Sequence, residues 1–103
     1  MKHQDIETLP QVSQVKLDLI AARALIVDEN KWCQIHLLHI HPEHGEQLCS
    51  AGALRKTLSR DGFRLSNAAF VLSSSMNGGI GTYNDCHTHA EVMRAWDKAI
   101  VEA

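Results

Sequence analysis

The sequence predicts a mainly α-helical domain, with about four helices around one core and a short strand or hairpin near residues 32–41. Three observations predict it. Apolar residues recur at helical spacing in four separate segments, a helix-start motif precedes the last of them, and the 103-residue length suits a single domain. An α+β fold is the alternative. With 45% apolar but only 5% aromatic residues, the core must be largely aliphatic, with the two Trp and the two Phe as anchors.

The first predicted helix follows a loose, polar N-terminal lead over residues 1–10. From Ser13 onward, apolar side chains repeat every three or four positions, which indicates one buried face. The residues of that face are Val15, Leu19, Ala22 and Ile26. Asn30 is the expected end of this helix.

Residues 31–47, KWCQIHLLHIHPEHGEQ, carry the most ambiguous pattern. Apolar and polar side chains alternate from Cys33 to Leu37, which favours a strand, but the alternation slips at Leu38. A helix over 32–41 fits almost as well. An extended segment would need a partner strand. Residues 80–83 (IGTY) are the candidate within the chain, and a second copy of the protein is the other.

Two helices are predicted in the middle of the chain. The first begins near Cys49, and Gly52 in its first turn indicates that another part of the backbone approaches there. The inner face of this helix is Ala51, Leu54 and Leu58. The second has Ser66 as its expected N-cap. Its inner face is Ala69, Leu72 and Met76.

The last helix has the clearest start signal in the chain. Thr88 and Glu91 have the spacing of a capping box, in which each side chain bonds the backbone amide of the other residue. Beyond them, one face is apolar, and Trp96 lies in its middle. We therefore expect Trp96 to be a central core residue.

Composition excludes several classes of function. The formal charge of −2 gives no long-range attraction to nucleic acid or anionic lipid. A helix–turn–helix pattern over residues 53–72 carries several cations, but its second helix is not strongly basic, so nucleic-acid binding is not expected. No apolar run indicates an export signal or a membrane span. Three cysteines in such a chain indicate reduced thiols and a cytoplasmic protein.

Residues 84–89 (NDCHTH) concentrate groups that could do chemistry. A thiol enzyme needs a cysteine at a helix start, a histidine and an orienting amide or carboxylate. The candidates are Cys49, His87, His89, Asn84 and Asp85. The simpler interpretation is structural: Asn84 and Asp85 would accept hydrogen bonds from backbone amides and join this loop to the helix after Cys49. Contact with a partner protein is a third interpretation.

The histidine-rich stretch allows a zinc site. Cys33, His36, His44 and Cys49 could supply two sulfur and two imidazole ligands, with His39 and His41 in reserve. However, the chain has no Cys-x-x-Cys pair and no zincin motif. A solvated, pH-sensitive histidine face is the preferred interpretation, so no cofactor is predicted.

Three sequence blocks together resemble a small domain family of unknown function with bacterial and phage members. The blocks are KWCQ (31–34), CSAGALRKTL (49–58) and YNDCHTHAEVMRAWDKAI (83–100). The matching positions are Trp32; Cys49, Gly52, Ala53 and Leu54; Asn84 and Asp85; and Thr88, Glu91 and Val92. The resemblance implies a helical fold and a phage or mobile-element setting. It implies no catalytic activity.

These observations favour a non-enzymatic accessory protein of a phage or mobile element. We expect it to bind a host or phage protein, with modulation of a defence system as one such role. A homodimer is compatible with the unpaired strand. The alternative is a Cys/His-dependent enzyme or a zinc-stabilised module.

Overall fold

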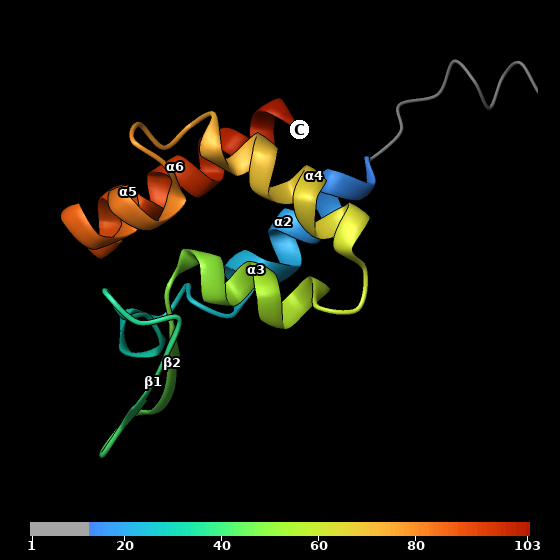
Figure 1. The fold of residues 1–103 in the computed structure, drawn as a ribbon. Coiled ribbons are helices and arrows are strands. Elements are labelled where there is room, and N and C mark those ends of the chain that lie inside the picture. The colour runs from blue at the N-terminus through green and yellow to red at the C-terminus, as the bar shows by residue number, and fades with distance from the viewer. Residues whose placement is uncertain (1–12) are drawn as a thin grey trace, which may run out of the picture.

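The computed structural model describes residues 13–103, so the expected N-terminal lead over 1–10 lies outside the described residues. Within 13–103 the chain forms five α-helices, one short 3-10 helix and one two-stranded hairpin (Figure 1). The elements are α2 (Gln14–Ala24), η1 (Glu29–Lys31), β1 (Leu38–His41), β2 (Gly45–Leu48), α3 (Ser50–Leu58), α4 (Gly62–Ser73), α5 (Ile80–Cys86) and α6 (His89–Glu102). The predicted mainly α fold with a short hairpin is confirmed.

Helix α2 begins where the sequence predicts but ends earlier. The Ser13 hydroxyl caps it by accepting the Lys16 amide at 3.0 Å. The helix stops at Ala24 rather than at Asn30 because Asp28 starts a separate 3-10 turn. The Asp28 carboxylate accepts a hydrogen bond from the Asn30 amide at 2.9 Å, and local caps of this kind compete with continuation of the helix.

Helix α3 confirms the prediction of a close backbone approach at Gly52. A Cβ atom added to this glycine would lie 2.1 Å from the Leu37 carbonyl oxygen. The approaching strand segment therefore passes directly over the first turn of α3. Cys49 caps this helix, with its sulfur accepting the Gly52 amide at 3.3 Å.

Helix α4 starts earlier than predicted. Asp61, not Ser66, is the N-cap, and its carboxylate accepts the Arg64 amide at 3.1 Å. An ionised carboxylate is a stronger acceptor than a hydroxyl and also complements the helix dipole, so the earlier start is favoured. Leu72 and Met76 are buried as expected.

The strand prediction was right in kind but wrong in its partner. β1 pairs antiparallel with β2, from Leu38 opposite Leu48 to His41 opposite Gly45. Gly45 has a positive φ of 74°, which lets the chain turn back locally. Residues 80–83, the expected partner, instead begin α5. A hairpin closed by so short a turn loses much less loop entropy than pairing with a distant segment.

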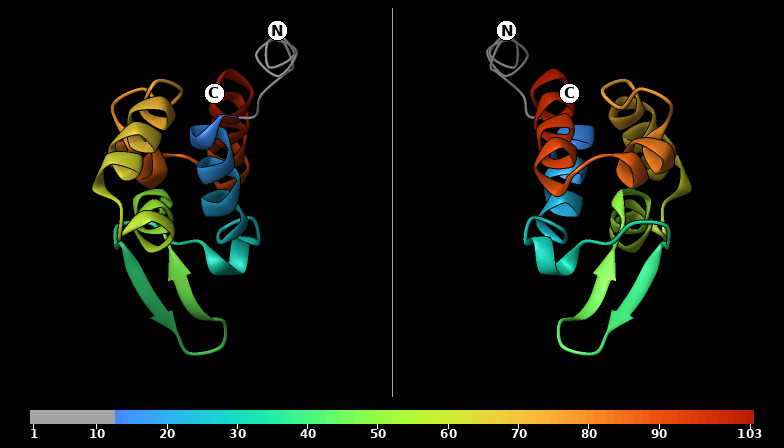
Figure 2. Two further views of the ribbon diagram at one scale, coloured as in Figure 1. Left: turned by 90° about the vertical axis from the view of Figure 1, so that its right-hand side faces the viewer. Right: turned by 90° about the vertical axis from the view of Figure 1, so that its left-hand side faces the viewer.

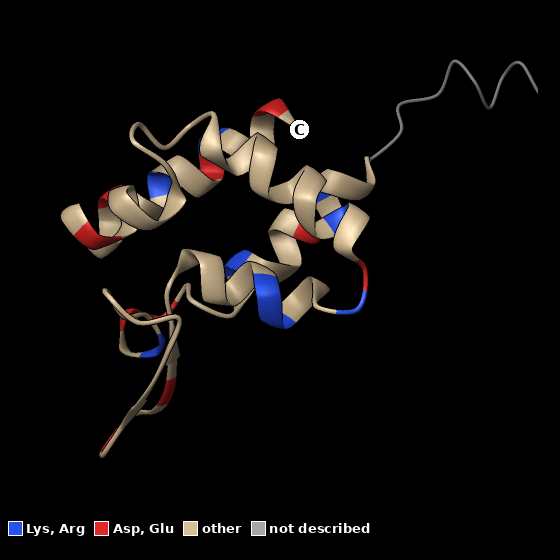
Figure 3. Ribbon diagram, viewed as in Figure 1, with Lys and Arg blue, Asp and Glu red and all other residues tan. Residues whose placement is uncertain are grey.

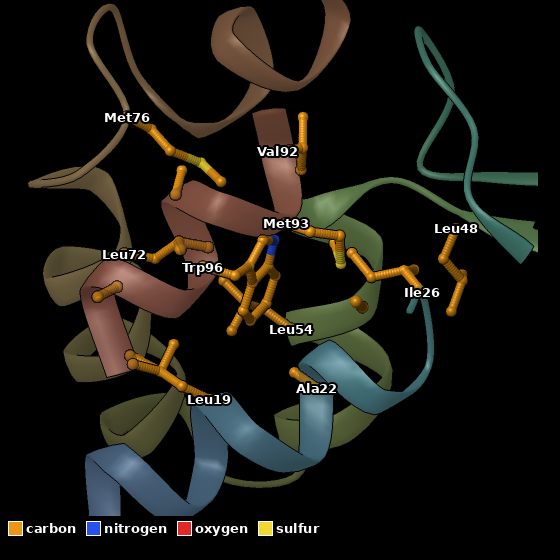
Figure 4. Packing of buried hydrophobic residues seen from close by; sticks show 14 of the residues in the cluster. Leu19, Ala22, Ile26, Leu48, Leu54, Leu72, Met76, Val92, Met93 and Trp96 are labelled. Carbon is orange, nitrogen blue, oxygen red and sulfur yellow. The ribbon is translucent and has the colours of Figure 1, made fainter. Parts of the chain in front are cut away.

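The hydrophobic core lies among the helices, with Trp96 at its centre (Figure 4). Trp96 is fully buried, as predicted, and Leu54, Leu72 and Met93 pack around it. The two Phe were wrongly expected as anchors, since Phe63 and Phe70 lie on the outer side of α4 and are 78% and 77% exposed. Both hydrogen bonds of the predicted capping box, between Thr88 and Glu91, fix the start of α6. Figure 2 shows α2 alongside α6, with α4 and α5 across from them and the hairpin extending beyond the helices. Across residues 13–103, no helix has the length and apolar character needed to cross a membrane.

An ion pair between a buried carboxylate and a partly exposed guanidinium ties α2 to α4. Asp18 is 3% exposed and accepts two hydrogen bonds from the Arg64 guanidinium, at 2.6 and 3.0 Å. These bonds hold the pKa of Asp18 below its usual range, against the opposing effect of burial. The contribution of the pair to stability is therefore present above the carboxyl's unfolded pKa and is lost as the pH falls through the lowered folded value.

Candidate functional site

Asn84, the first residue of the Asn-Asp step, lies in a fully buried position on α5. Its side-chain oxygen accepts three hydrogen bonds: from the Trp32 indole at 2.8 Å, the Ser50 amide at 3.0 Å and the Ser50 hydroxyl at 2.9 Å. These donors come from the segment before the hairpin and from the start of α3. One amide side chain thus joins three segments that are far apart in the sequence.

Ser50 extends this network into the core. Its hydroxyl accepts a hydrogen bond from the Trp96 indole at 3.0 Å while donating to Asn84. A buried indole N–H needs an acceptor, and the two tryptophans of the chain obtain theirs from the Ser50–Asn84 pair. Cys49, as the N-cap, sets Ser50 at the first position of α3, where its amide is free to donate.

The side chains of Asn84 and Asp85 also form hydrogen bonds with residues 33–35. The Asn84 side-chain amide donates to the Cys33 carbonyl at 3.1 Å, and Asp85 accepts the Ile35 amide at 2.8 Å. Gln34 reaches back to the carbonyls of Asn84 and His87, at 3.3 and 3.0 Å. We call Asn84 and Asp85 together the Asn-Asp clamp. It fixes the point at which the hairpin segment (residues 35–48) begins.

Ile35 has an unusual backbone within this clamp. Its φ is +78°, and it is the single non-glycine residue with positive φ among residues 13–103. A β-branched residue in this left-handed region is strained. Its side chain is also 74% exposed, so burial does not offset the strain.

His87 and His89 each bond to a backbone carbonyl. His87 Nδ1 lies 2.8 Å from the Tyr83 oxygen, and its ring stacks on Tyr83 at 3.7 Å between centroids. His89 Nε2 lies 2.8 Å from the Ile26 oxygen, and its ring packs against Trp32. Because a carbonyl only accepts, both nitrogens carry hydrogen. Neither of these nitrogens is free to act as a base.

The structure separates the candidate nucleophile, Cys49, from the hollow that Asp85, His87 and His89 line. Cys49 is buried, and its sulfur is occupied by the Gly52 amide. Across residues 13–103, no hydrogen bond joins a cysteine sulfur to a histidine ring. Burial, followed by the charges of Cys49 and Asp85, raises the pKa of the Cys33 thiol to about 11, so Cys33 stays protonated at neutral pH. This arrangement favours the structural interpretation of Asn84 and Asp85.

The four predicted zinc ligands do not form one group. The Cys33 thiol donates to the His36 carbonyl at 3.3 Å, which uses the backbone and not the ring of that histidine. His44 instead lies with His41, which the sequence offered as a reserve ligand, and with Glu43, which was not among the candidates. Within residues 13–103, His41, Glu43 and His44 form the one group of metal-ligand types whose ligand atoms all lie within 4.8 Å of one another.

An open, polar hollow of about 400 Å³ borders the clamp. Its walls include Trp32, Gln34, Asp85, His87 and His89. Cys86, which is exposed, also lines it, whereas Cys49 does not. The roles of Gln34 and Ser50 were not found from the sequence. The available signal was that two tryptophans in a chain poor in aromatics must each find a hydrogen-bond acceptor.

Comparison with known proteins identifies the family. A family model described as a family of unknown function (DUF6197) matches residues 10–102. The chain belongs to this family. The match runs across the clamp, the hairpin and all five described helices. No curated protein and no solved structure matches the chain.

Proposed function

We propose that this DUF6197 domain is a protein-binding module that docks through its hairpin segment. The observation that carries the proposal is a run of exposed apolar side chains, the apolar strip, formed by Ile35, Leu37, Leu38 and Ile40. They are 74%, 46%, 48% and 64% exposed, respectively. These four exposed apolar side chains lie within residues 35–40, and exposed apolar surface marks interaction sites in soluble proteins. The hairpin that carries Leu38 and Ile40 extends beyond the helices (Figure 1).

The strain at Ile35 supports the same assignment. A left-handed backbone is disfavoured by roughly 1–2 kcal/mol for an L-residue, and here the Asn-Asp clamp holds it in place. Strained residues that the surroundings over-determine are concentrated at binding and catalytic positions. The strain turns a large apolar side chain toward solvent, which benefits a partner and not the fold.

The hollow beside the strip indicates the chemistry of the partner. It measures about 440 Å³ and lies between the hairpin and α3, with Leu38 and Leu48 on one side and Arg55 and Lys56 on the other. Lys56 pairs with Glu46, whereas Arg55 forms no ion pair within residues 13–103. The blue positions along α3 in Figure 3 mark these cations. An apolar segment with an acidic flank fits this surface best.

β1 offers a second mode of contact at the same place. In the described chain its outer edge has no partner strand, since the two-stranded sheet is β1 paired with β2. Residues Trp32 and Cys33 instead cover β2, through a bridge to Leu48. An extended partner segment could add to β1 while placing apolar side chains in the hollow.

The proposed setting follows from the sequence resemblance. We place the protein in the cytoplasm as a non-enzymatic accessory protein of a phage or mobile element. Its target would be a host or phage protein, and a component of a defence system is the first class to test. A second copy of the chain is the competing occupant of the same surface, and the experiment below separates the two.

The test compares single substitutions of matched exposure. The tagged protein is expressed in a bacterial host, and the captured proteins are quantified for wild type, Ile35→Asp, Ile40→Asp and Val101→Asp. Val101, on α6, is 77% exposed and so matches Ile35 in exposure but lies outside the strip. We expect a captured protein that both hairpin variants lose and Val101→Asp retains. Circular dichroism confirms that each variant is folded.

Two further results decide between the interpretations. Sedimentation that shows a dimer in wild type and a monomer in Ile35→Asp would assign the surface to a second copy. Capture that survives both hairpin substitutions would contradict the proposal. Cys49→Ser and His87→Ala, if folded, should leave capture unchanged. Loss of capture in these two variants alone would favour the Cys/His alternative.

A further inference from the structure

The turn of the hairpin gathers three metal-ligand side chains. His41 ends β1, and Glu43 and His44 lie in the turn before Gly45. Their ligand atoms all lie within 4.8 Å of one another. The Lys31 ammonium donates to the His44 carbonyl at 2.6 Å, which fixes the backbone of the turn but leaves the His44 ring free. Both imidazoles are only half-buried, so an ion can reach them from solvent.

We propose that His41, Glu43 and His44 bind a divalent transition-metal ion of the zinc class. Two imidazoles and one carboxylate form a ligand set that zinc accepts in proteins, with water in the remaining position. A carboxylate also offsets part of the charge of the ion. Of the four ligands that the sequence suggested, this set retains only His44; His41 was a reserve ligand and Glu43 is new.

Binding requires His41 to exchange its present hydrogen bonds for a metal bond. His41 Nδ1 accepts the amides of Glu43 and His44, at 3.0 and 3.2 Å. A neutral ring that accepts at Nδ1 carries its proton on Nε2, so one nitrogen must be released or the ring must turn before it can coordinate. Glu43 is exposed and His44 is half-buried, so water can replace His41 as the acceptor for both amides. A metal–imidazole bond can therefore replace the two hydrogen bonds that His41 accepts.

The neighbouring histidines define the limits of the site. His36, His39, His41 and His44 form a row along the hairpin, with ring centroids 6.0, 6.4 and 4.5 Å apart in turn. The shortest of these separations is the one inside the proposed site. His39 and His36 lie farther along the row and are the natural controls.

Metal at this position would not hold the fold together. No residue from Ile35 to Glu46 is buried, whereas the core lies among the helices. The ion would instead stiffen the turn and leave a coordination position facing outward from the tip. Chelation should therefore leave the melting temperature of the helices unchanged, unlike removal of a structural zinc.

The test is calorimetric titration of the purified, metal-free protein with Zn²⁺ at about pH 7.5, where unperturbed histidines are neutral. We expect one equivalent bound with a dissociation constant of about 10 µM or tighter. His41→Ala and His44→Ala should each weaken binding on the order of 100-fold, and Glu43→Gln by less. His39→Ala and Cys33→Ala should bind as wild type does.

Imidazole proton signals in NMR spectra give a second measurement that does not depend on the variants folding. Addition of Zn²⁺ should shift the His41 and His44 resonances and leave those of His87 and His89 in place. Absence of stoichiometric binding by wild type would overturn the inference. So would binding that Cys33→Ala abolishes and His41→Ala preserves, which would assign zinc to the cysteine-containing set instead.

Discussion

The helices and the hairpin segment (residues 35–48) differ in how they use their apolar residues. The helices build the core around Trp96 and both indoles have a hydrogen-bond acceptor, although the helices also leave Leu17, Ile20, Phe63 and Phe70 exposed. The hairpin segment exposes most of its own, strains Ile35 and adds only Leu48 to the hydrophobic core cluster. Stability is therefore concentrated in the helices, whereas the hairpin segment is where we propose that a partner binds. The Asn-Asp clamp is the junction between them.

Truncating the side chain at the centre of the hydrophobic core should have the largest effect on stability. Trp96→Ala removes a fully buried indole, and we expect a loss of about 3–5 kcal/mol in the free energy of unfolding. Chemical denaturation measures it, with Val101→Ala as an exposed control on the same helix. A value within about 0.5 kcal/mol of wild type would show that α6 is not docked as described.

Substitutions in the Asn-Asp clamp should have the next largest effect on stability. Asn84→Ala leaves the Trp32 indole and the Ser50 amide without their acceptor, so we expect a loss of about 2–4 kcal/mol. Asp85→Ala is the comparison. It removes the acceptor of the Ile35 amide in an exposed segment, and we expect only about 1 kcal/mol because water can replace it. Equal effects in denaturation would contradict the assignment of Asn84 as the centre of the network.

A smaller effect is expected at the start of α6. Thr88→Ala removes the cap of the Glu91 amide and should lower stability by about 1 kcal/mol. Thr88→Ser retains a hydroxyl and serves as the control. Denaturation midpoints of the two variants should differ, and indistinguishable midpoints would mean that the cap contributes little here.

The smallest effect should have the opposite sign and lies in the hairpin segment. Asn tolerates the left-handed region better than Ile, so Ile35→Asn should raise stability by about 0.5–1 kcal/mol. Ile40→Asn, at an ordinary strand position, should show no such gain. If Ile35→Asn gains stability and also loses the captured partner, Ile35 serves partner binding at the expense of stability. Destabilisation by Ile35→Asn would instead mean that the side chain supports the fold.

Features set by local rules were predictable from the sequence. The start of the first helix near Ser13, the capping box at Thr88 and the burial of Trp96 each follow from spacing within one helix. The close approach at Gly52 was also predicted, although the approaching group is the Leu37 carbonyl and not the loop before α6. Errors occurred where two local signals competed, as for Asp61 against Ser66 at the start of α4.

The site depended on contacts that spacing does not encode. Asn84 and Asp85 were expected to join their loop to the start of α3, and Asn84 does bond to Ser50. Their bonds to Trp32, Cys33 and Ile35 cross about fifty positions of the chain and depend on how α5 packs against the segment before the hairpin. No periodicity records such a contact. The grouping of His41 with Glu43 similarly depends on the shape of one turn.

The hydrogen-bonded pair of Ser50 and Asn84 couples the fluorescence of the two tryptophans. The chain has two tryptophans, and both indoles donate into this one pair, one from the base of the hairpin and one from the core. Intrinsic fluorescence therefore reads the core and the hairpin base together. A single substitution at Asn84 should change the emission of both rings, whereas zinc at the tip or a contact on the outer strand should leave it nearly unchanged.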